Sequence, residues 1–354
     1  MKAIAIHRGS DEPELIEKPR PDPRHGEALV RTLRVGVDGT DHEVLSGSHG
    51  GFPDGEDHMV MGHEAVGVVE DANGTGLEEG SLVVPTVRRK PNGETNEYFR
   101  RGEPDMAPDG EYHERGIVGD HGYMSEYFTS PADALVPVPE EIAEYGIFVE
   151  PLSNTEKALE HAFAARSAFE WQPESAAVLG NGPLGLLTLW QLEQEFDRTY
   201  CLGRRDRPDL TIDFIEKVGS TYVDSRATPV DDIPDEHEPL DFIYEATGYA
   251  PHAFQSVEAL APNGVAALLG IPNSWEFEID GGSLHNEIVL HNKCLVGSVN
   301  AGVRHFEGSV DTVASMPDDL LDHLITTVTD PENVEPAFED GDDQIKAVVE
   351  FESW

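Results

Sequence analysis

A glycine-rich hexapeptide, GNGPLG, lies near the middle of the chain, between a strand-like run at Ala176 to Leu179 and a helix-like run. In a G-x-G-x-x-G turn the first glycine permits the tight turn, the second lets a pyrophosphate approach the backbone, and the third lets helix and strand pack closely. Amides at the helix N-terminus then bind the phosphates. The sequence therefore predicts a dinucleotide site, with a purely structural turn as the alternative. Its residues are Gly180, Asn181, Gly182, Pro183, Leu184 and Gly185.

Two arginines follow the next strand-like run, which ends at Gly203. A site for NAD has an acidic residue about twenty residues after the glycines, where it binds the ribose 2′-hydroxyl. Here Arg204 and Arg205 stand in that place, and arginine pairs well with a 2′-phosphate. We therefore predict NADP as the preferred cofactor and NAD as the weaker one. A solvated basic turn is the alternative.

The elements that must position these residues alternate between strand and helix from Ser175 to Pro272, which predicts a parallel sheet with helices on both faces. This is a doubly wound Rossmann domain, expected at 156–295. The rest, 1–155 and 296–354, is expected to form a β-rich domain. It should contain strands at Ala28 to Val37, Ala65 to Glu70 and Ser81 to Pro85, and a long loop at Lys90 to Gly122.

Three predictions concern the junction and the tail. A helix is expected over Pro151 to Phe169, capped by Ser153. A second is expected over Asp319 to Val328. The final apolar run, Ile345 to Glu352, should return to the β-rich domain.

The composition is strongly acidic, with 69 Asp and Glu against 24 Lys and Arg and a net charge of −45. Such a charge makes nucleic acid an improbable partner. It also pushes a compact fold apart unless salt screens the repulsion, which predicts a salt-adapted protein. The chain has no apolar run of membrane-spanning length and an N-terminus unlike a signal peptide, so we expect a cytoplasmic protein that binds no membrane. Cys201 and Cys294 are interpreted as structural.

Two further segments indicate a family. VDGTD at 37–41 and GHEAVGVV at 62–69, with His63 25 positions after Asp38, resemble the C-G-T-D and G-H-E motifs of zinc-dependent medium-chain alcohol dehydrogenases. That family joins a GroES-like catalytic domain to a Rossmann domain, an α/β fold. The segments at 88–105, 110–128 and 146–162 resemble the archaeal glucose dehydrogenases, especially halophilic ones.

The resemblance implies a catalytic zinc ion held by Asp38, His63 and Glu150, with Glu64 near enough to bind directly or through water. Three protein ligands and one open position are typical of catalytic zinc. Asp38 stands where the family has cysteine, and a carboxylate is a harder ligand, so metal affinity and selectivity should differ. The structural zinc of many relatives should be absent, because the loop at 90–122 contains no cysteine. We expect salt-dependent packing or oligomer contacts to hold that loop, and His113 and His121 to be solvated.

The implied reaction is oxidation of an aldose, D-glucose. Zinc would lower the pKa of the C1 hydroxyl, hydride would pass from C1 to the nicotinamide, and gluconolactone would form. The proton would leave through Thr40, Glu64 or ordered water. Sugar hydroxyls would bind Glu114, Glu150, Asn154 and Asn300.

Two alternatives remain open at this point. One is another zinc alcohol or polyol dehydrogenase, such as one for sorbitol. The other is a non-catalytic nucleotide-binding member of the superfamily. The family also implies a homo-oligomer, a dimer or tetramer, in which the edge segment NKCLVGSV would pair.

Overall fold

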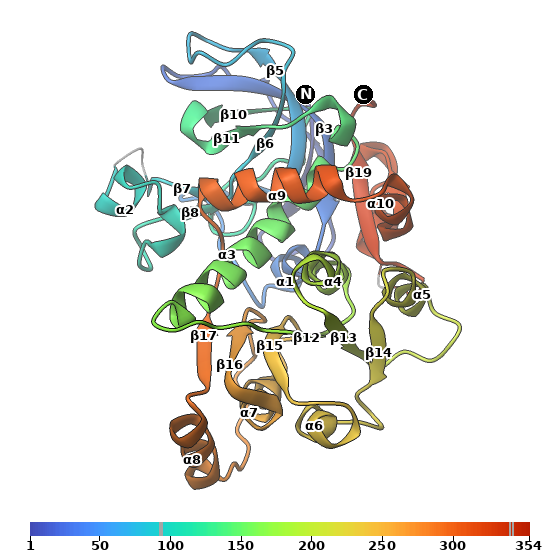
Figure 1. The fold of residues 1–354 in the computed structure, drawn as a ribbon. Coiled ribbons are helices and arrows are strands. Elements are labelled where there is room, and N and C mark those ends of the chain that lie inside the picture. The colour runs from blue at the N-terminus through green and yellow to red at the C-terminus, as the bar shows by residue number, and fades with distance from the viewer. Residues whose placement is uncertain (92–94, 340, 342) are drawn as a thin grey trace. The chain divides into compact units, whose positions relative to one another are not determined.

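The computed structural model describes all residues except 92–94, 340 and 342. It divides into two compact units, one formed by 1–153 with 300–354 and the other by 154–299 (Figure 1).

The first unit is built on a seven-stranded sheet with the order β11-β6-β5-β3-β19-β18, to which β10 adds by pairing with β3. Two three-stranded sheets, β2-β1-β4 and β7-β8-β9, complete it. Its strands are β1 (Lys2–His7), β2 (Glu14–Glu17), β3 (Glu27–Val37), β4 (His58–Val60), β5 (Glu64–Asp71), β6 (Leu82–Pro85), β7 (Arg88–Arg89), β8 (His113–Arg115), β9 (Gly119–Asp120), β10 (Tyr127–Pro131), β11 (Leu135–Pro137), β18 (Ile325–Thr329) and β19 (Lys346–Glu350). Its helices are α1 (Gly39–Ser46), α2 (Glu97–Arg100), α9 (Val303–Ser315) and α10 (Asp318–Leu324).

The last strand of the chain lies inside this sheet, between β3 and the edge strand β18. β19 pairs antiparallel with β3, with Val349 opposite Val35, and the three strands predicted in the opening segment are β3, β5 and β6. The C-terminal run therefore returns to the opening domain as predicted, and its apolar side chains belong to the core of the first unit.

Two predictions for local structure were wrong. The helix expected over Asp319 to Val328 ends at Leu324, and Ile325–Thr329 forms β18 because its β-branched side chains suit a strand that pairs with β19. Ser153 is not a helix cap, because α3 (Val149–Arg166) begins four residues earlier. The hydroxyl of Ser153 instead donates to the carbonyl of Glu150 within the helix, at 2.5 Å.

The second unit is a six-stranded parallel sheet with the order β14-β13-β12-β15-β16-β17. This is the order of a doubly wound dinucleotide-binding fold. Helices α4 and α5 lie on one face and α6 and α7 on the other (Figure 1). The strands are β12 (Ser175–Leu179), β13 (Arg198–Gly203), β14 (Thr221–Asp224), β15 (Leu240–Glu245), β16 (Leu260–Leu268) and β17 (Cys294–Gly297). The helices are α4 (Pro183–Glu195), α5 (Leu210–Lys217), α6 (Ile233–Glu236), α7 (Ala250–Ala259) and α8 (Gly281–His291).

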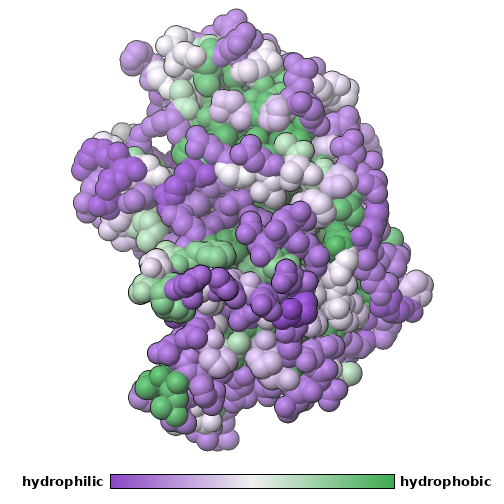
Figure 2. Space-filling view, viewed as in Figure 1, coloured by the Kyte–Doolittle hydropathy of each residue, from purple (hydrophilic) through white to green (hydrophobic). Residues whose placement is uncertain are grey.

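The surface is largely hydrophilic on the face seen in Figure 2, with an apolar patch at α8. Val289 and Leu290 on this helix are 59% and 65% exposed, and Leu295 on the edge strand β17 is 37% exposed. None of the helices that the structure describes is long and apolar enough to cross a membrane.

Candidate active site

His63 lies at the centre of a buried group of acidic side chains in the first unit. It stands at the turn before β5 and is 4% exposed. Its Nε2 is 3.5 Å from Oδ2 of Asp38. Its Nδ1 is buried and forms no hydrogen bond with any residue that the structure describes, although Oδ1 of Asp41 is 4.0 Å away. The ring therefore has carboxylates near both nitrogens.

Asp38 has a second role as the N-cap of α1. Its Oδ1 accepts a hydrogen bond from the amide of Asp41 at 3.1 Å, and Oδ2 of Asp41 accepts one from the amide of Asp38 at 3.2 Å. Oδ1 of Asp41 also accepts from the amide of Gly62 at 3.2 Å. This capping box fixes Asp38 and ties α1 to the turn that presents His63. The sequence analysis missed Asp41, although two acids three residues apart before a helical run are a recognisable signal.

Glu64 is the first residue of β5, and its Oε2 forms an ion pair with Lys346, the first residue of β19. Both side chains are 1% exposed. Sequence reasoning did not find Lys346, because 282 positions separate it from Glu64 and it matched no motif. The scarcity of lysine is the one available signal, since the chain has only seven lysines.

Glu150 comes from the second position of α3 and is 6% exposed. Ligand atoms of His63, Glu64 and Glu150 all lie within 4.8 Å of one another, and so do those of Asp38, Asp41 and His63. The structure thus places two of the predicted zinc ligands, Asp38 and Glu150, near the imidazole of the third, His63, and Glu64 lies beside them.

If all four carboxyl groups of this group were ionised, their negative charge would exceed the positive charge of Lys346 and His63. Burial, with repulsion from Glu64 and Asp38, raises the pKa of Glu150 to about 8, and burial raises that of Asp41 to about 7. Burial also opposes the charge of Asp38, but attraction and hydrogen bonding to His63 outweigh it and hold the pKa of Asp38 below its usual range. The same carboxylates raise the pKa of His63 well above 6.5 against the effect of burial.

A divalent cation fits this arrangement. Three buried carboxyl groups and that of Asp38, whose side chain is 25% exposed, face one lysine and one histidine. Buried negative charge is stable only when it is paired, protonated or bound to metal. Imidazole and carboxylate are both zinc donors. The role of Asp38, His63 and Glu150 as ligands stays a prediction, and the donor set is suited to it.

Two of the residues predicted to bind sugar lie together in the first unit. Oε1 of Glu114, on β8, accepts hydrogen bonds from Nε of Arg88 at 3.0 Å and from Nδ2 of Asn300 at 3.2 Å. Glu114 is 8% exposed. The other two are on α3, where Asn154 lies one turn after Glu150, and Thr40 is partly exposed on α1.

Arg88 holds the segment that the sequence predicted as a long loop. Its guanidinium lies 3.6 Å from the ring centroid of Tyr112, and its Nη1 donates to the carbonyl of Asp105 at 2.7 Å. This segment contains α2, β8, β9 and a short 3-10 helix, so the expectation of an unstructured loop was incomplete. The buried Arg88 fastens it, and the neighbouring Arg89 donates to Tyr123 and Ser130, which follow the segment.

The predicted dinucleotide turn has the geometry that its glycines require. Gly180 follows β12 with φ of +113°, and a Cβ on Gly185 would lie 2.0 Å from the carbonyl oxygen of Gly180. Helix α4 begins at Pro183, after Gly182 as its N-cap, so its free amides face the turn. Asn181 donates from Nδ2 to Oγ1 of Thr211 at 2.5 Å, and Leu184 lies in the first turn of the helix.

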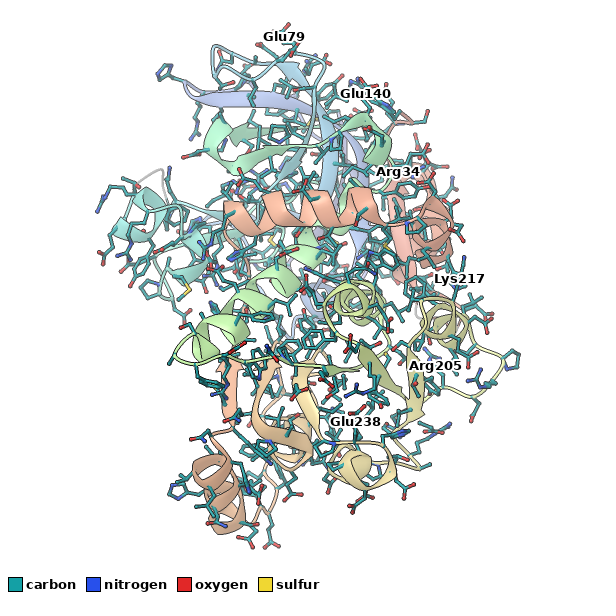
Figure 3. The ribbon with its side chains drawn as sticks, viewed as in Figure 1. Arg34, Glu79, Glu140, Arg205, Lys217 and Glu238 are labelled. Carbon is teal, nitrogen blue, oxygen red and sulfur yellow. The ribbon has the colours of Figure 1, made fainter. Side chains whose placement is uncertain are left out.

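A cavity of about 410 Å³ adjoins this turn within the second unit. Arg204 and Arg205, which follow β13, line it beside Gly180 and Asn181. Figure 3 labels Arg205 in the second unit. Arg226 also lines it and was missed by the sequence analysis; its Nη2 pairs with Asp206 at 2.6 Å and with Asp224 at 2.7 Å. The cavity therefore combines a glycine turn with three guanidinium groups, which suits a phosphorylated ribose.

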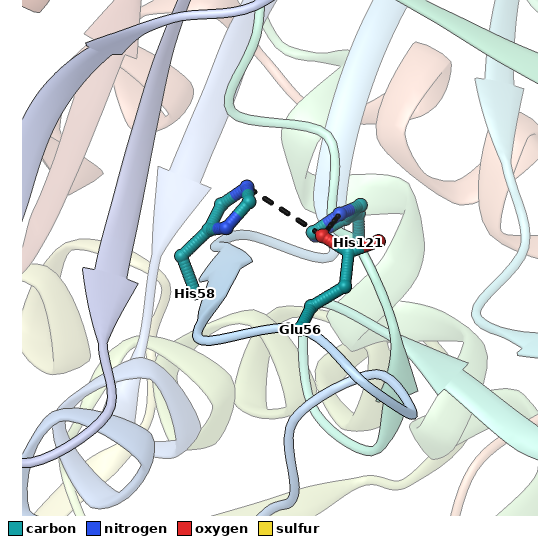
Figure 4. A group of neighbouring side chains, drawn as sticks. All are labelled: Glu56, His58 and His121. Carbon is teal, nitrogen blue, oxygen red and sulfur yellow. Dashed lines mark hydrogen bonds and ion pairs between the residues drawn. The ribbon is translucent and has the colours of Figure 1, made fainter.

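A second group of potential ligands lies elsewhere in the first unit. Glu56, His58 and His121 place one donor atom each within 4.8 Å of one another (Figure 4). His121 is thus packed against other side chains, whereas sequence analysis expected a solvated ring.

Known proteins agree with this architecture. Residues 143–351 match the family model described as glucose dehydrogenase C-terminus, and residues 24–140 match the alcohol dehydrogenase GroES-like domain. A glucose 1-dehydrogenase of Haloarcula marismortui is 74% identical over 353 residues, which is 100% of either chain. The chain belongs to the glucose dehydrogenase family.

Solved structures extend the comparison. The Haloferax mediterranei glucose dehydrogenase in complex with NADP, Zn and gluconolactone is 64% identical, with a TM-score of 0.98 over 100% of either chain. The alcohol dehydrogenase TADH from Thermus sp. ATN1 is 20% identical, with a TM-score of 0.81 over 99% of either chain, and shares the fold. These likenesses confirm the predicted α/β fold, a GroES-like domain with a Rossmann domain, and the predicted family.

Proposed function

We propose that the chain is a glucose 1-dehydrogenase that transfers a hydride from C1 of D-glucose to NADP and yields gluconolactone. The observation that carries this proposal is the placement of Asp38 and Glu150 near the buried ring of His63, in the same unit as the hydrogen-bonded pair of Glu114 and Asn300. Support also comes from the full-length identity to the Haloarcula enzyme and from the complex formed by the Haloferax enzyme.

Zinc, when bound by Asp38, His63 and Glu150, supplies a Lewis acid that lowers the pKa of the C1 hydroxyl. The chain's own residues handle the proton. Lys346 engages Oε2 of Glu64, so Oε1 is the oxygen that remains to accept a proton, directly or through Thr40 or ordered water. The ion pair also keeps Glu64 in place in a site where an unpaired buried carboxylate would be costly.

Recognition of the sugar rests on paired donors and acceptors. Glu114 accepts hydrogen bonds from Arg88 and Asn300 through Oε1, which leaves Oε2 to accept from a sugar hydroxyl. Asn300, Glu150 and Asn154 supply further polar groups. A buried polar group without a partner costs about 1–3 kcal/mol, so these groups favour a polyhydroxylated substrate over an apolar alcohol.

NADP is the cofactor that the second unit suits best. The amides at the start of α4 would bind the pyrophosphate, and Arg204 and Arg205 the 2′-phosphate. NAD lacks that phosphate and should bind more weakly.

The test is the initial rate of NADP reduction in molar salt with a panel of aldoses and polyols, together with zinc content per chain. We expect D-glucose to give the highest kcat/KM and one zinc ion per chain. Faster oxidation of sorbitol would favour the polyol dehydrogenase alternative, and a zinc-free chain without activity would favour the non-catalytic one.

Three expectations accompany the proposal. The scarcity of lysine and the charge of −45 suit a salt-rich cytoplasm, as do relatives from Haloarcula and Haloferax. A homo-oligomer paired through β17 is consistent with the apolar patch of α8 and β17. Nucleic acid remains an improbable partner on charge grounds.

A further inference from the structure

Arg226 lines the nucleotide cavity with a guanidinium group whose hydrogen-bonding edges are occupied. Its Nε and Nη2 donate to the carboxylate of Asp224 at 2.9 and 2.7 Å. Its Nη1 and Nη2 donate to the carboxylate of Asp206 at 3.2 and 2.6 Å. A guanidinium has two edges that each present a parallel pair of N–H groups, and a carboxylate occupies both of them here.

The two carboxylates also decide the charge at this place. Hydrogen bonds from Arg226 lower the pKa of Asp224 to about 2 and lower that of Asp206, so both acids are ionised at neutral pH. Together they carry more negative charge than Arg226 carries positive charge. A phosphate group would be repelled by them, and it would have to displace one of them to bind an edge of the guanidinium. Arg226 is therefore poorly suited to hold the 2′-phosphate.

The part of Arg226 that lines the cavity is the flat face of its guanidinium. Neither Asp206 nor Asp224 is among the described residues that line the cavity, so the two edges that bind them point away from it. A guanidinium whose donors are satisfied still stacks on an aromatic ring through its face. Arg226 thus offers a planar surface to an aromatic group in the cavity.

The turn after β14 holds Arg226 in place. The amide of Arg226 donates to Oδ1 of Asp224 at 2.9 Å, so the backbone and the guanidinium bind the same carboxylate. The amide of Ser225 donates to the carbonyl of Gly203 at 2.9 Å, which joins this turn to the end of β13. A side chain that is already ordered loses little conformational entropy when a ligand binds.

The order of the strands indicates which part of the cofactor meets this face. β12, β13 and β14 are neighbours in the parallel sheet, and Gly180, Arg204 and Arg226 follow their respective carboxyl ends. Neighbouring strands are about 4.8 Å apart, so a ligand that lies across these ends meets the three residues in that order. NADP would place its pyrophosphate at Gly180 and its 2′-phosphate at Arg204. The base on the same ribose comes next, at Arg226.

We propose that Arg226 is the residue on which the adenine ring of the cofactor stacks, and that Asp206 and Asp224 fix it in this role by occupying its edges. The inference rests on the NADP site of the proposed function. Thr247, which follows β15, and His252, on α7, line the same cavity and bound the space for the ring. NADP and NAD both contain adenine, so Arg226 contributes equally to both and takes no part in the choice between them.

The test measures the binding of adenine nucleotides to the cofactor-free protein in molar salt by titration calorimetry. The probes are adenosine 2′,5′-bisphosphate and ADP, which differ in the 2′-phosphate. Arg226→Leu should weaken both by the same factor, about fivefold, which is the size of one cation–π contact. The double change Arg204→Ala and Arg205→Ala should weaken the bisphosphate alone. A loss confined to the bisphosphate in Arg226→Leu, or no loss at all, would overturn the proposal.

Two further variants separate the flat face of Arg226 from its charge. Arg226→Tyr keeps a flat face without the charge, and Arg226→Lys keeps the charge without a flat face. We expect Arg226→Tyr to bind both nucleotides within about twofold of the parent, because bases also stack on aromatic side chains. Arg226→Lys should bind them as weakly as Arg226→Leu does. The reverse ranking would mean that Arg226 acts through its charge, and it would overturn the proposal.

Arg198→Leu is the matched control. Arg198 begins β13, at the end of the strand opposite the cavity, and its guanidinium also binds two carboxylates, those of Glu238 at 2.6 Å and Glu174 at 3.3 Å. Its replacement should leave both affinities unchanged. An equal loss of affinity in Arg198→Leu would show that the loss in Arg226→Leu is only structural. Since the probes involve no catalysis, a chain that binds them through Arg226 but does not oxidise glucose would contradict the proposed function alone.

Discussion

At the scale of single residues, Asp38 carries two functions with one carboxylate. Oδ1 caps α1, and Oδ2 faces His63. Substitution to alanine should remove a predicted zinc ligand and a helix cap together, and loss of such a cap costs about 0.5–2 kcal/mol. We expect Asp38→Ala to lose zinc and activity. Asp38→Cys should stay active and hold zinc longer against a chelator, because Zn–S at about 2.3 Å and Zn–O at about 2.0–2.2 Å are similar and thiolate is softer.

Zinc content and glucose oxidation against time in chelator, at fixed high salt, check this prediction for the parent and both variants. Asp280→Ala is the matched control, since Asp280 caps α8 through bonds to Gly282 and Ser283 and belongs to the other unit. Stoichiometric zinc in Asp38→Ala would show that Asp38 is no ligand.

The acidic group should also make zinc binding depend on pH. Without metal, Glu150 with its pKa of about 8 and His63 with its raised pKa hold protons at neutral pH. Zinc binds the deprotonated forms, so it must displace these protons, and affinity rises as pH rises toward about 8. Each displaced proton weakens binding about tenfold per pH unit below the pKa concerned. Calorimetry of zinc binding to the metal-free protein between pH 6 and 9 measures both affinity and proton release. A pH-independent affinity would contradict this assignment.

Arg204 and Arg205 allow a test of cofactor choice at the same scale. Replacing both with alanine should raise KM for NADP by at least about tenfold, since a charge-assisted hydrogen bond contributes roughly 1.5–3 kcal/mol, and leave KM for NAD nearly unchanged. Steady-state kinetics with each cofactor in turn provide the measurement. Equal effects on the two cofactors would mean that the arginines do not bind the 2′-phosphate.

At the scale of elements, Arg88 joins β7 to the segment that contains α2 and β8. Its side chain is 4% exposed, and removing one partner of a buried ion pair typically costs about 3–5 kcal/mol. Arg88→Met should therefore lower the stability of the first unit and raise KM for glucose, because Glu114 loses the donor that orients it. Arg101→Met is the control, since Arg101 is 52% exposed and pairs with exposed acids. Thermal unfolding and glucose kinetics measure the two effects, and equal results for both variants would contradict the role of Arg88.

Some elements and site residues could be predicted from the sequence, and others could not. The alternating strands and helices of the second unit and the glycine turn were predictable, because hydrophobic periodicity and glycine spacing are local. The motif positions Asp38, His63 and Glu150 came from resemblance. The contact of Lys346 with Glu64 could not be predicted from the sequence, because it depends on the pairing of β19 with β3, which are far apart in the chain. The strand at Ile325–Thr329 was mistaken for helix because β18 begins directly after the last residue of α10, and the apolar spacing of the helix runs on into it.

At the scale of the whole molecule, the charge of −45 should make stability depend on salt. At about 0.1 M salt the screening length is about 10 Å, so acids on neighbouring elements repel one another, whereas at 1 M it is about 3 Å. We expect activity and folded structure to fall as salt is dialysed away. Circular dichroism and activity across that range measure this, with sucrose as a control that is excluded from the surface but does not screen charge. Unchanged stability at about 0.1 M would show that repulsion does not limit the fold.

The place of β19 has a consequence for biosynthesis. The ribosome makes the chain from its N-terminus, yet Lys346 and β19, which belong to the seven-stranded sheet of the first unit, are made only after the whole second unit. Domains generally fold in order of synthesis at about 5–20 residues per second. The second unit can therefore fold while the first still lacks β19, and Glu64 acquires its cation only after Lys346 has been synthesised. A chain truncated before Lys346 should keep its nucleotide-binding unit and lack a competent metal site.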